Sequence, residues 1–430
     1  MVMKSLAQIA AALEGYDPQA LSVPQVQAFL EQLAPLRHDG PVETLPVMAA
    51  GERILARDVV SPVDVPPHDN SAMDGFAFTG SDLSATEPTV LQCVGHALAG
   101  AAWAGPPPQT GQCLRITTGA IMPAGLDTVV AHEMVQVQGE RITIPLGRVH
   151  TGDNRRLRGE DIAQGQAALR QGQRLTPAAW GLLASLGLPE VAVRQRLRVA
   201  YFSTGDEILS LGQTPREGAV YDSNRYTVAG LVQALGCELI DMGVVRDDPI
   251  AVEQAFVDAA SKADAIITSG GVSVGEADHT KAMMKKLGDV AFWRIAMRPG
   301  RPMAVGRITQ GNRSAVLFGL PGNPVAVMVT FAAFVRPAMQ QLMGWQAPAL
   351  PLLKAKSTEA LRKKPGRTEY QRGIVSTNAA GELQVSITGN QGSGVLSSMV
   401  QANGLIVLGH AQGNVAVGDA VDVMMFDGHL

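Results

Sequence analysis

The 430-residue chain has few cysteines, few aromatic residues and no large excess of either charge. Its three cysteines, Cys93, Cys113 and Cys237, lie far apart and form no Cys-x-x-Cys pair. This spacing argues against a disulfide framework and against a zinc site, and it favours a reducing compartment, so we expect a cytoplasmic protein. A net charge of −4 gives no support for nucleic-acid binding, which usually needs a basic excess.

Long apolar runs and two common nucleotide-binding motifs are also missing. The longest apolar stretch, 324–335, is too short to span a bilayer. The apolar segment 6–13 contains Gln8 and precedes Glu14, which is typical of an amphipathic helix and not of a signal peptide. The chain has no Gly-x-x-x-x-Gly-Lys-Ser/Thr, and no Gly-x-Gly-x-x-Gly follows the first strand expected after residue 193. We therefore expect neither a P-loop nucleotidase nor a dinucleotide enzyme, and no membrane partner.

The length of the chain predicts about two to four domains. Between 197 and 343, expected strands alternate with expected helices, which predicts βαβ units and a mostly parallel, doubly wound sheet. The flanking regions carry short strands separated by Gly, Pro and Asp. The fold class expected is therefore multidomain α/β plus β. The expected division is a discontinuous N-terminal domain (1–60 with 150–192), a β-rich domain (61–149), the α/β domain (193–346) and a small β-barrel or sandwich (347–430).

One glycine-rich loop lies near the centre of the α/β region. An apolar strand expected at 263–268 ends at Ser269, and a helix is expected to begin near Asp278. Open α/β sheets bind ligands where a strand gives way to such a loop. Three glycines, Gly270, Gly271 and Gly275, would let backbone N–H groups approach an anion. An ordinary strand-to-helix turn explains the loop equally well, and Asp278 could either cap the helix or hold a cation.

Charged and turn-forming residues follow the other expected strands as well. Because such loops converge on the carboxyl edge of a parallel sheet, we expect these residues to lie close together. They are Glu207, Asp247, Arg298, Arg301 and the turn Pro321-Gly322-Asn323. Carboxylates that face arginines around a glycine loop suit a phosphate bridged by Mg²⁺. Asp248 fits a helix cap better than a ligand, and Asp206 is equally consistent with a turn.

A polar segment outside this region, 66–77, contains Asp74 between two expected strands. A surface turn with a solvated Asp74 explains it slightly better than a functional site does. Two further segments are suggestive in the same weak way: 117–120, with Thr118, and 158–161, with Asp161.

Taken together, four motifs carry a resemblance to a known family. They occur in this order: Asp69-Asn70-Ser71-Ala72-Met73-Asp74-Gly75, Phe202-Ser203-Thr204-Gly205-Asp206-Glu207, Ser269-Gly270-Gly271-Val272-Ser273-Val274-Gly275 and Gly319-Leu320-Pro321-Gly322-Asn323-Pro324. The combination resembles the molybdopterin molybdenumtransferase (MoeA) family, which is related to the C-terminal part of gephyrin. The resemblance implies an elongated four-domain homodimer whose third domain binds molybdopterin. It also implies a reaction in which adenylylated molybdopterin receives molybdenum from molybdate and AMP is released with the help of Mg²⁺.

The resemblance also implies site residues. The catalytic group would be Asp74, Glu207, Asp247, Asp278 and Arg298, with Glu207, Asp247 and Asp278 as metal ligands. The substrate-binding group would be Thr118, Asp161, Ser269, Gly270, Gly271, Ser273, Gly275, Arg294, Arg301, Pro321, Gly322, Asn323, Arg372 and Ser393. The individual roles of the four acids are left open. The chain has arginine at 294, 298 and 301, where the family often has lysine, and an arginine does not release a proton near neutral pH.

Two other functions stay open at this point. The same α/β domain serves relatives that adenylylate molybdopterin, and gephyrin-like proteins also act as non-catalytic scaffolds. The additional domains and the Met73-Asp74-Gly75 motif favour molybdenum insertion. Further partners implied are the molybdopterin adenylyltransferase and downstream cofactor-handling proteins. The use of tungsten and the form of the downstream cofactor are left open.

Overall fold

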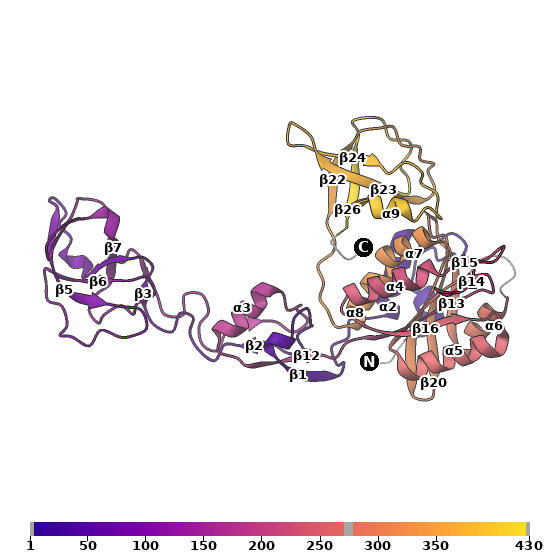
Figure 1. Cartoon of the computed structure of the whole chain (residues 1–430), viewed down its shortest axis with the longest axis horizontal. Helices are drawn as coiled ribbons and strands as arrows, with labels where there is room; N and C mark the ends of the chain where they lie inside the picture. The colour runs from indigo at the N-terminus through magenta and orange to yellow at the C-terminus, as the bar shows by residue number, and fades with distance from the viewer. Residues whose placement is uncertain (1–3, 271–277, 427–430) are drawn as a thin grey trace.

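The computed structural model describes residues 4–270 and 278–426. The chain is elongated: the β-rich region lies at one end, and the α/β region with the C-terminal strands lies at the other (Figure 1). A narrow region that contains α3 (Pro177–Ser185) connects the two ends. Consequently, segments that carry candidate site residues lie at opposite ends of a single chain.

The α/β region is built on a six-stranded mixed sheet. Its strand order is β16 (Glu238–Val245), β13 (Arg198–Thr204), β17 (Ala265–Ser269), β21 (Arg313–Leu320), β20 (Pro302–Gln310) and β18 (Gly288–Arg294). The first four strands are parallel, as expected, and β20 and β18 form antiparallel pairs beside them. Since β18 is antiparallel to β20, it runs in the same direction as β21. The residues that follow β18 therefore reach the same edge as the other strand ends.

The sequence did not reveal β20, which begins at Pro302 and is interrupted by Gly306 and Arg307. It is a strand because it forms an antiparallel hairpin with β21, and Gly306 lets the backbones of β18 and β20 approach closely. This pairing is a long-range interaction that local apolar periodicity does not report.

Helices cover both faces of this sheet, and the alternation of side chains along β13 shows it. Phe202 packs with α5 and α6 on one face, whereas Tyr201 packs with α4, α7 and the N-terminal helices on the other. Apart from these, the two short strands β14 and β15 pair with each other. The bounds are α1 (Leu6–Ala11), α2 (Val23–Leu33), β14 (Ile208–Leu209), β15 (Val220–Tyr221), α4 (Ser223–Ala234), α5 (Pro249–Lys262), α6 (Asp278–Leu287) and α7 (Pro324–Thr330).

The sequence also predicts one long helix at 325–343, and the structure divides this segment into three parts. After α7, a π-helical turn (Phe331–Val335) leads into α8 (Arg336–Leu342). Within the described residues, the segment Pro324–Leu342 is the one helix long and apolar enough to cross a membrane, and 72% of its most apolar 18-residue window is buried inside the protein. It packs in the core that also contains Phe29 and Phe318.

We expect Phe202→Ala to lower the free energy of unfolding by about 3–5 kcal/mol. Phe202 is fully buried, and its ring meets that of Phe256 edge to face with centroids 5.1 Å apart, so truncation leaves a cavity beneath β13. Urea denaturation measures the change. Ile250→Ala on α5 is the control, because Ile250 is 79% exposed and should change stability by about 0.5 kcal/mol or less. Equal losses for both variants would contradict this account of the core.

The narrow region is made of short antiparallel strand pairs. In each pair, one strand leads from the α/β region towards the β-rich region and the other leads back. β1 (Val42–Pro46) pairs with β12 (Glu190–Arg194), β2 (Val59–Val60) with β11 (Ala167–Leu169), and β3 (Asn70–Ser71) with β10 (Arg155–Arg156). In contrast, α1 and α2 pack in the core of the α/β region. The division of the chain into domains stays a prediction.

Strands predominate in the β-rich region at the far end of the molecule from the α/β sheet. The β-rich sheet has the order β7 (Thr128–Ala131), β4 (Gly75–Phe78), β6 (Gln112–Ile116), β5 (Thr89–Ala97), β9 (Arg141–Ile144) and β8 (Gln136–Gln138). Among the described residues, 3-10 turns occur at Gly80–Asp82 and His132–Met134 in this region and at Val47–Ala49 in the narrow region. The sequence of this region predicts short strands at 90–95, 113–117, 128–131 and 142–144, and the structure confirms them as β5, β6, β7 and β9.

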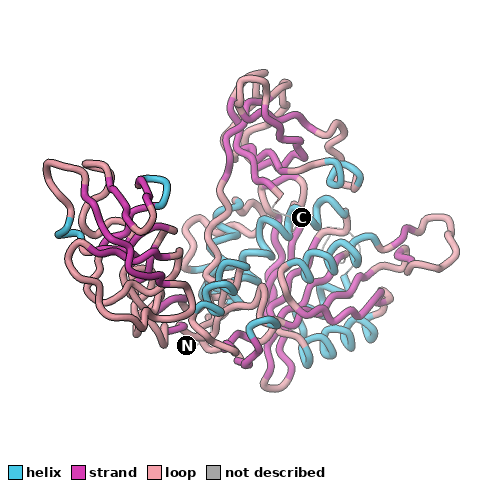
Figure 2. Tube along the Cα trace, turned by 60° about the vertical axis from the view of Figure 1, so that its left-hand side comes forward, coloured by secondary structure: helices cyan, strands magenta, loops and turns pink. Residues whose placement is uncertain are grey.

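The C-terminal strands close into a barrel, as expected, because β23 pairs with both β24 and β25. The barrel contains β22 (Leu352–Ser357), β23 (Thr368–Thr377), β24 (Leu383–Ile387), β25 (Gly404–Leu408) and β26 (Ala420–Met425), with α9 (Ser397–Gln401) beside it. Figure 2 shows these strands gathered apart from the helices of the α/β region. β19 (Met297–Arg298) leaves the α/β region and pairs with β23, which joins the two regions.

Candidate active site

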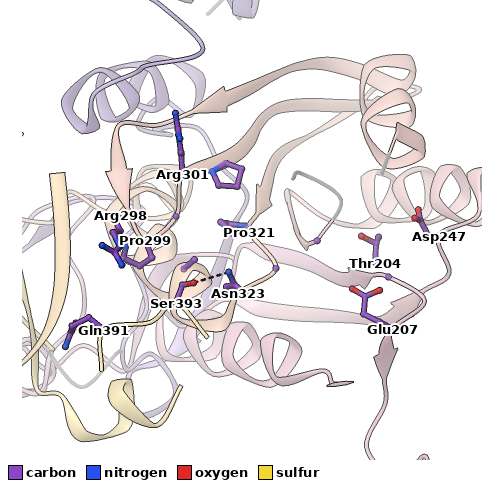
Figure 3. A pocket seen from close by; sticks show the side chains of 16 residues that line it. Thr204, Glu207, Asp247, Arg298, Pro299, Arg301, Pro321, Asn323, Gln391 and Ser393 are labelled. Atoms are coloured by element: carbon purple, nitrogen blue, oxygen red, sulfur yellow. Dashed lines mark hydrogen bonds between the residues drawn. The ribbon is translucent and has the colours of Figure 1, made fainter. Parts of the chain in front are cut away.

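A cavity of about 680 Å³ lies at the carboxyl edge of the α/β sheet, where the C-terminal region meets it (Figure 3). Loops that follow β13, β16, β17, β18 and β21 form most of its wall, and a loop of the barrel region completes it. The lining residues are Thr204, Gly205, Glu207, Asp247, Gly270, Arg298, Pro299, Gly300, Arg301, Pro302, Pro321, Gly322, Asn323, Ala326, Gln391 and Ser393.

The structure brings many of the expected site residues together here. They are Glu207, Asp247, Gly270, Arg298, Arg301, Pro321, Gly322, Asn323 and Ser393. The candidate list omitted Thr204, Gly205, Pro299, Gly300, Pro302, Ala326 and Gln391, which also line the cavity. Two of these residues, Gly205 and Gly300, could have been found from the sequence, because a glycine in the loop after a strand often marks a ligand-binding turn. Gly205 and Gly300 have positive φ, and a Cβ on Gly300 would lie 2.5 Å from Thr330.

Acidic and basic groups occupy different parts of the wall. Glu207 and Asp247 come from the ends of the neighbouring strands β13 and β16 and lie at one side, whereas Arg298 and Arg301 lie at the other (Figure 3). Both arginines are exposed, so their guanidinium groups are available to an anion. The cavity therefore suits a ligand that carries negative charge and also binds a cation.

The acidic side has the donor chemistry of a hard cation site. Asp247 Oδ1 is buried and has no hydrogen-bond partner among the described residues, and such an orphaned oxygen calls for an explanation. Two carboxylates leave room for ligands from substrate and water, which is how Mg²⁺ is usually bound. The residues that the structure describes contain no group of three His, Cys, Asp or Glu placed to hold a metal. Asp278 begins α6, and its side chain lies outside the described part.

A buried polar cluster lies on β13 and β17, at the strand ends that precede Gly205 and Gly270. The Tyr201 hydroxyl is 2.7 Å from Ser269 Oγ and 2.8 Å from Ser203 Oγ. Burial raises the pKa of Tyr201, which keeps the phenol neutral. Ser269 lies below the cavity wall, while Gly270 lines it with φ +91°, and a Cβ on Gly270 would meet the carbonyl oxygen of Thr204 at 2.6 Å. Gly271, Ser273 and Gly275 lie outside the described residues.

Arg294 and Arg372 take positions that the sequence did not specify. Arg294 ends β18 opposite Pro302 and does not line the cavity. Arg372 on β23 is 1% exposed; its guanidinium donates to Ser398 Oγ (3.0 Å) and to the carbonyl oxygen of Gly392 (3.0 Å). Burial, and then the nearby charge of Arg298, lower the pKa of Arg372. Arg372 thus holds the loop that carries Gln391 and Ser393.

A smaller cavity of about 340 Å³ adjoins the first. Arg298, Pro299 and Gln391 line both cavities, and Arg372 lines the smaller one. The two cavities therefore meet at a cationic junction between the α/β region and the barrel.

Asp74 and Thr118 form a separate, exposed pair. Asp74 Oδ1 accepts hydrogen bonds from the backbone N–H of Thr118 (2.6 Å) and from its hydroxyl (2.8 Å). These bonds, the backbone one first, lower the pKa of Asp74, so the carboxylate stays ionised and oriented. The pair lies beside β3, β4 and β6, in the β-rich region at the end of the molecule opposite the α/β region (Figure 1), whereas Asp161 is exposed in the segment that follows β10. None of the three lines the cavity.

Fold and site together define a class of protein. It is a multidomain α/β protein with a cavity at the sheet edge that is lined by acidic and basic side chains and completed by a small barrel. Three family models match this chain: the MoeA N-terminal region (domain I and II) at 21–187, a probable molybdopterin binding domain at 200–341, and the MoeA C-terminal region (domain IV) at 354–426.

Individual relatives agree with this match. The chain is 42% identical to a molybdopterin molybdenumtransferase of Haemophilus influenzae over 94% of this chain and 98% of the relative. It is 31% identical to a gephyrin of Dictyostelium discoideum over 93% of this chain and 61% of that protein. A solved molybdopterin biosynthesis MoeA protein of Pyrococcus horikoshii superposes with a TM-score of 0.80 and 26% identity, covering 95% of this chain and 100% of that one. The chain belongs to the molybdopterin molybdenumtransferase family.

Proposed function

We propose that this chain is an enzyme of molybdenum cofactor biosynthesis that inserts molybdenum from molybdate into adenylylated molybdopterin and releases AMP. One observation carries the proposal: the cavity at the sheet edge places Glu207 and Asp247 opposite Arg298 and Arg301. That arrangement suits a phosphate ester with a bound cation and a second oxyanion. The reaction named for the Haemophilus influenzae relative supports it.

The residues of the cavity have distinct tasks in this reaction. The guanidinium groups of Arg298 and Arg301 bind the phosphate and molybdate oxygens and neutralise the charge that develops on the leaving phosphate. The Gly270 backbone can approach the anion closely because no Cβ intervenes. Arg372 keeps Gln391 and Ser393 at the wall, and a fixed wall lowers the entropic cost of orienting two substrates.

Mg²⁺ is part of the proposal, and Glu207 and Asp247 are the described residues that would hold it. The orphaned Asp247 Oδ1 fits this role. When bound, Mg²⁺ neutralises phosphate oxygens and thereby eases cleavage of the P–O bond. We propose Asp278 as a third acid of the site because it begins α6 directly after the glycine loop.

The pair Asp74–Thr118 leads us to propose a homodimer. Within one chain this pair does not line the cavity, and the β-rich strands beside it lie at the end of the molecule opposite the α/β sheet (Figure 1), yet its carboxylate is held in a defined orientation. In a two-fold dimer, the β-rich region of one subunit could complete the cavity of the other. We place the protein in the cytoplasm, where its three free cysteines would stay reduced, with the adenylyltransferase and later cofactor-handling proteins as partners.

The two alternative functions are not favoured. A scaffold would have no use for carboxylates and arginines gathered at the strand ends. An adenylyltransferase would consume ATP, so incubation with ATP and molybdopterin should yield no pyrophosphate if the proposal is right.

The direct test measures AMP. Incubation with adenylylated molybdopterin, molybdate and Mg²⁺ should release AMP, and omission of molybdate should stop the release. EDTA should also stop it and added Mg²⁺ should restore it, because the carboxylate side of the cavity needs a cation to bind phosphate oxygens. Full activity after thorough chelation would refute the metal role, and no AMP under any condition would refute the function.

A further inference from the structure

One turn of the cavity wall lacks the hydrogen bond that normally fixes it. The turn Pro321-Gly322-Asn323 leads into α7, and Asn323 is the N-cap residue of that helix. An N-cap asparagine normally accepts a hydrogen bond from the first helical turn. Here the side chain makes no capping bond; its amide nitrogen reaches Ser393 Oγ at 3.1 Å instead. The turn must therefore be held by groups outside α7.

The barrel region supplies one of these external contacts. Besides its hydroxyl, Ser393 offers its carbonyl oxygen to the backbone N–H of Val325 at 3.2 Å. That N–H is one of the donors left free at a helix N-terminus, and the preceding Pro324 has no N–H to give. The loop at Ser393 thus contacts the N-terminus of α7.

On the other side, a buried side chain of α4 reaches the same turn. Asn224 is 9% exposed, and its Nδ2 donates to the carbonyl oxygen of Gly322 at 2.7 Å. The backbone around Asn224 is itself held in place at the start of α4. Asp222 caps this helix by accepting a hydrogen bond from the backbone N–H of Arg225 (3.0 Å). Since a carbonyl can only accept, the amide nitrogen and not the oxygen must face Gly322.

The amide oxygen of Asn224 shows that this side chain is not there to satisfy the core. Its Oδ1 is buried and has no hydrogen-bond partner among the described residues. A buried acceptor without a partner costs stability, so an apolar side chain of similar size could serve the core as well. The contact that an apolar residue could not make is the one to Gly322.

We propose that Asn224 is a positioning residue for the reaction: it fixes the Pro321-Gly322-Asn323 turn, against which the barrel loop at Ser393 docks. This inference rests on the proposed function and assigns Asn224, which does not line the cavity, a role in it. Gly322, Asn323 and Ser393 all line the cavity, so displacement of the turn moves the wall on both sides of the domain boundary.

The variant Asn224→Asp tests the proposal. It keeps the shape of the side chain but replaces the donor by an oxygen that repels the Gly322 carbonyl. We expect AMP release to slow by about 10- to 100-fold while the KM for adenylylated molybdopterin and the number of pterin sites per chain stay unchanged, because misplaced walls affect the transition state most. The control is Gln233→Glu, the same amide-to-acid change at an exposed position of α4, which should leave the rate unchanged.

A second readout needs no substrate. Hydrogen exchange at the Val325 amide should become about 10-fold faster in Asn224→Asp, since its bond to Ser393 depends on the position of the turn. If Asn224→Asp does not fold, Asn224→Ala, which introduces no charge, carries the same test. Combining the substitution with Ser393→Ala should slow AMP release no more than the stronger single variant does, because both act through one turn.

Unchanged exchange at Val325, faster exchange with an unchanged rate, or losses that multiply in the double variant would each overturn the positioning role. Exchange is measured on the free protein, so it gives its result even if the wild-type chain releases no AMP. In that case the proposed function is wrong, but hydrogen exchange at Val325 still tests whether Asn224 holds the turn in place.

Discussion

Asp247→Asn is expected to slow AMP release by about 100-fold or more, while binding of adenylylated molybdopterin changes little. The reason lies in the orphaned Oδ1 of Asp247, which is buried at the acidic side of the cavity. An amide keeps the volume of the side chain but removes the negative charge that a hard cation requires. The Mg²⁺ concentration for half-maximal activity should therefore rise as well.

The neighbouring acid provides a matched control for this variant. Asp248 accepts bonds from the backbone N–H groups of Ile250 (3.1 Å) and Ala251 (3.0 Å) and thus caps α5, as its position before Pro249 suggested. Asparagine caps a helix about as well as aspartate, so Asp248→Asn should leave both the rate and the Mg²⁺ dependence unchanged. A rate measured as a function of Mg²⁺ for both variants separates the two roles. An Asp247→Asn rate equal to that of the control would rule out the metal role of Asp247.

Mixing two inactive variants, Asp74→Asn and Glu207→Gln, is expected to restore about a quarter of the sites after subunit exchange. Asp74 follows β3 and Glu207 follows β13, and these two strands lie at opposite ends of the molecule (Figure 1). A shared site would therefore draw Asp74 from one subunit and Glu207 from the other. Half of the randomly paired dimers are hybrids, and each hybrid has one intact site and one doubly damaged site. AMP release per chain, measured with exchange followed by mass, gives the recovered fraction.

A second mixture serves as the control for this experiment. Glu207 and Asp247 line the same cavity of one chain, so hybrids of Glu207→Gln with Asp247→Asn have two damaged sites and should stay inactive. If the first mixture also stays inactive although exchange is complete, Asp74 belongs to its own chain's site or has only a structural role. Recovery in both mixtures would exclude a site shared in this way.

The order of strands and helices in the α/β region could be predicted because it depends on patterns among residues close together in the sequence. Apolar strands and capped helices alternate along the chain, and a parallel sheet built from them places every strand end at one edge. That rule alone brought together Glu207, Asp247, Gly270 and Asn323, which the structure places around one cavity. It even placed Arg298 correctly although β20 was missed, because β18 still runs in the direction of β21.

The fold class, the order of the strand-end loops and, through four motifs, the family could all be predicted from the order of the residues. Tertiary structure alone decided that Arg372 is buried behind a loop, that Asp74 lies at the far end of the chain, and that Asn224 holds the turn at Gly322. The reason is physical: helix and strand patterns arise from neighbours a few residues apart, whereas these three outcomes depend on pairing and packing between segments remote in sequence, such as β19 with β23. The local periodicity of apolar residues does not predict such long-range contacts.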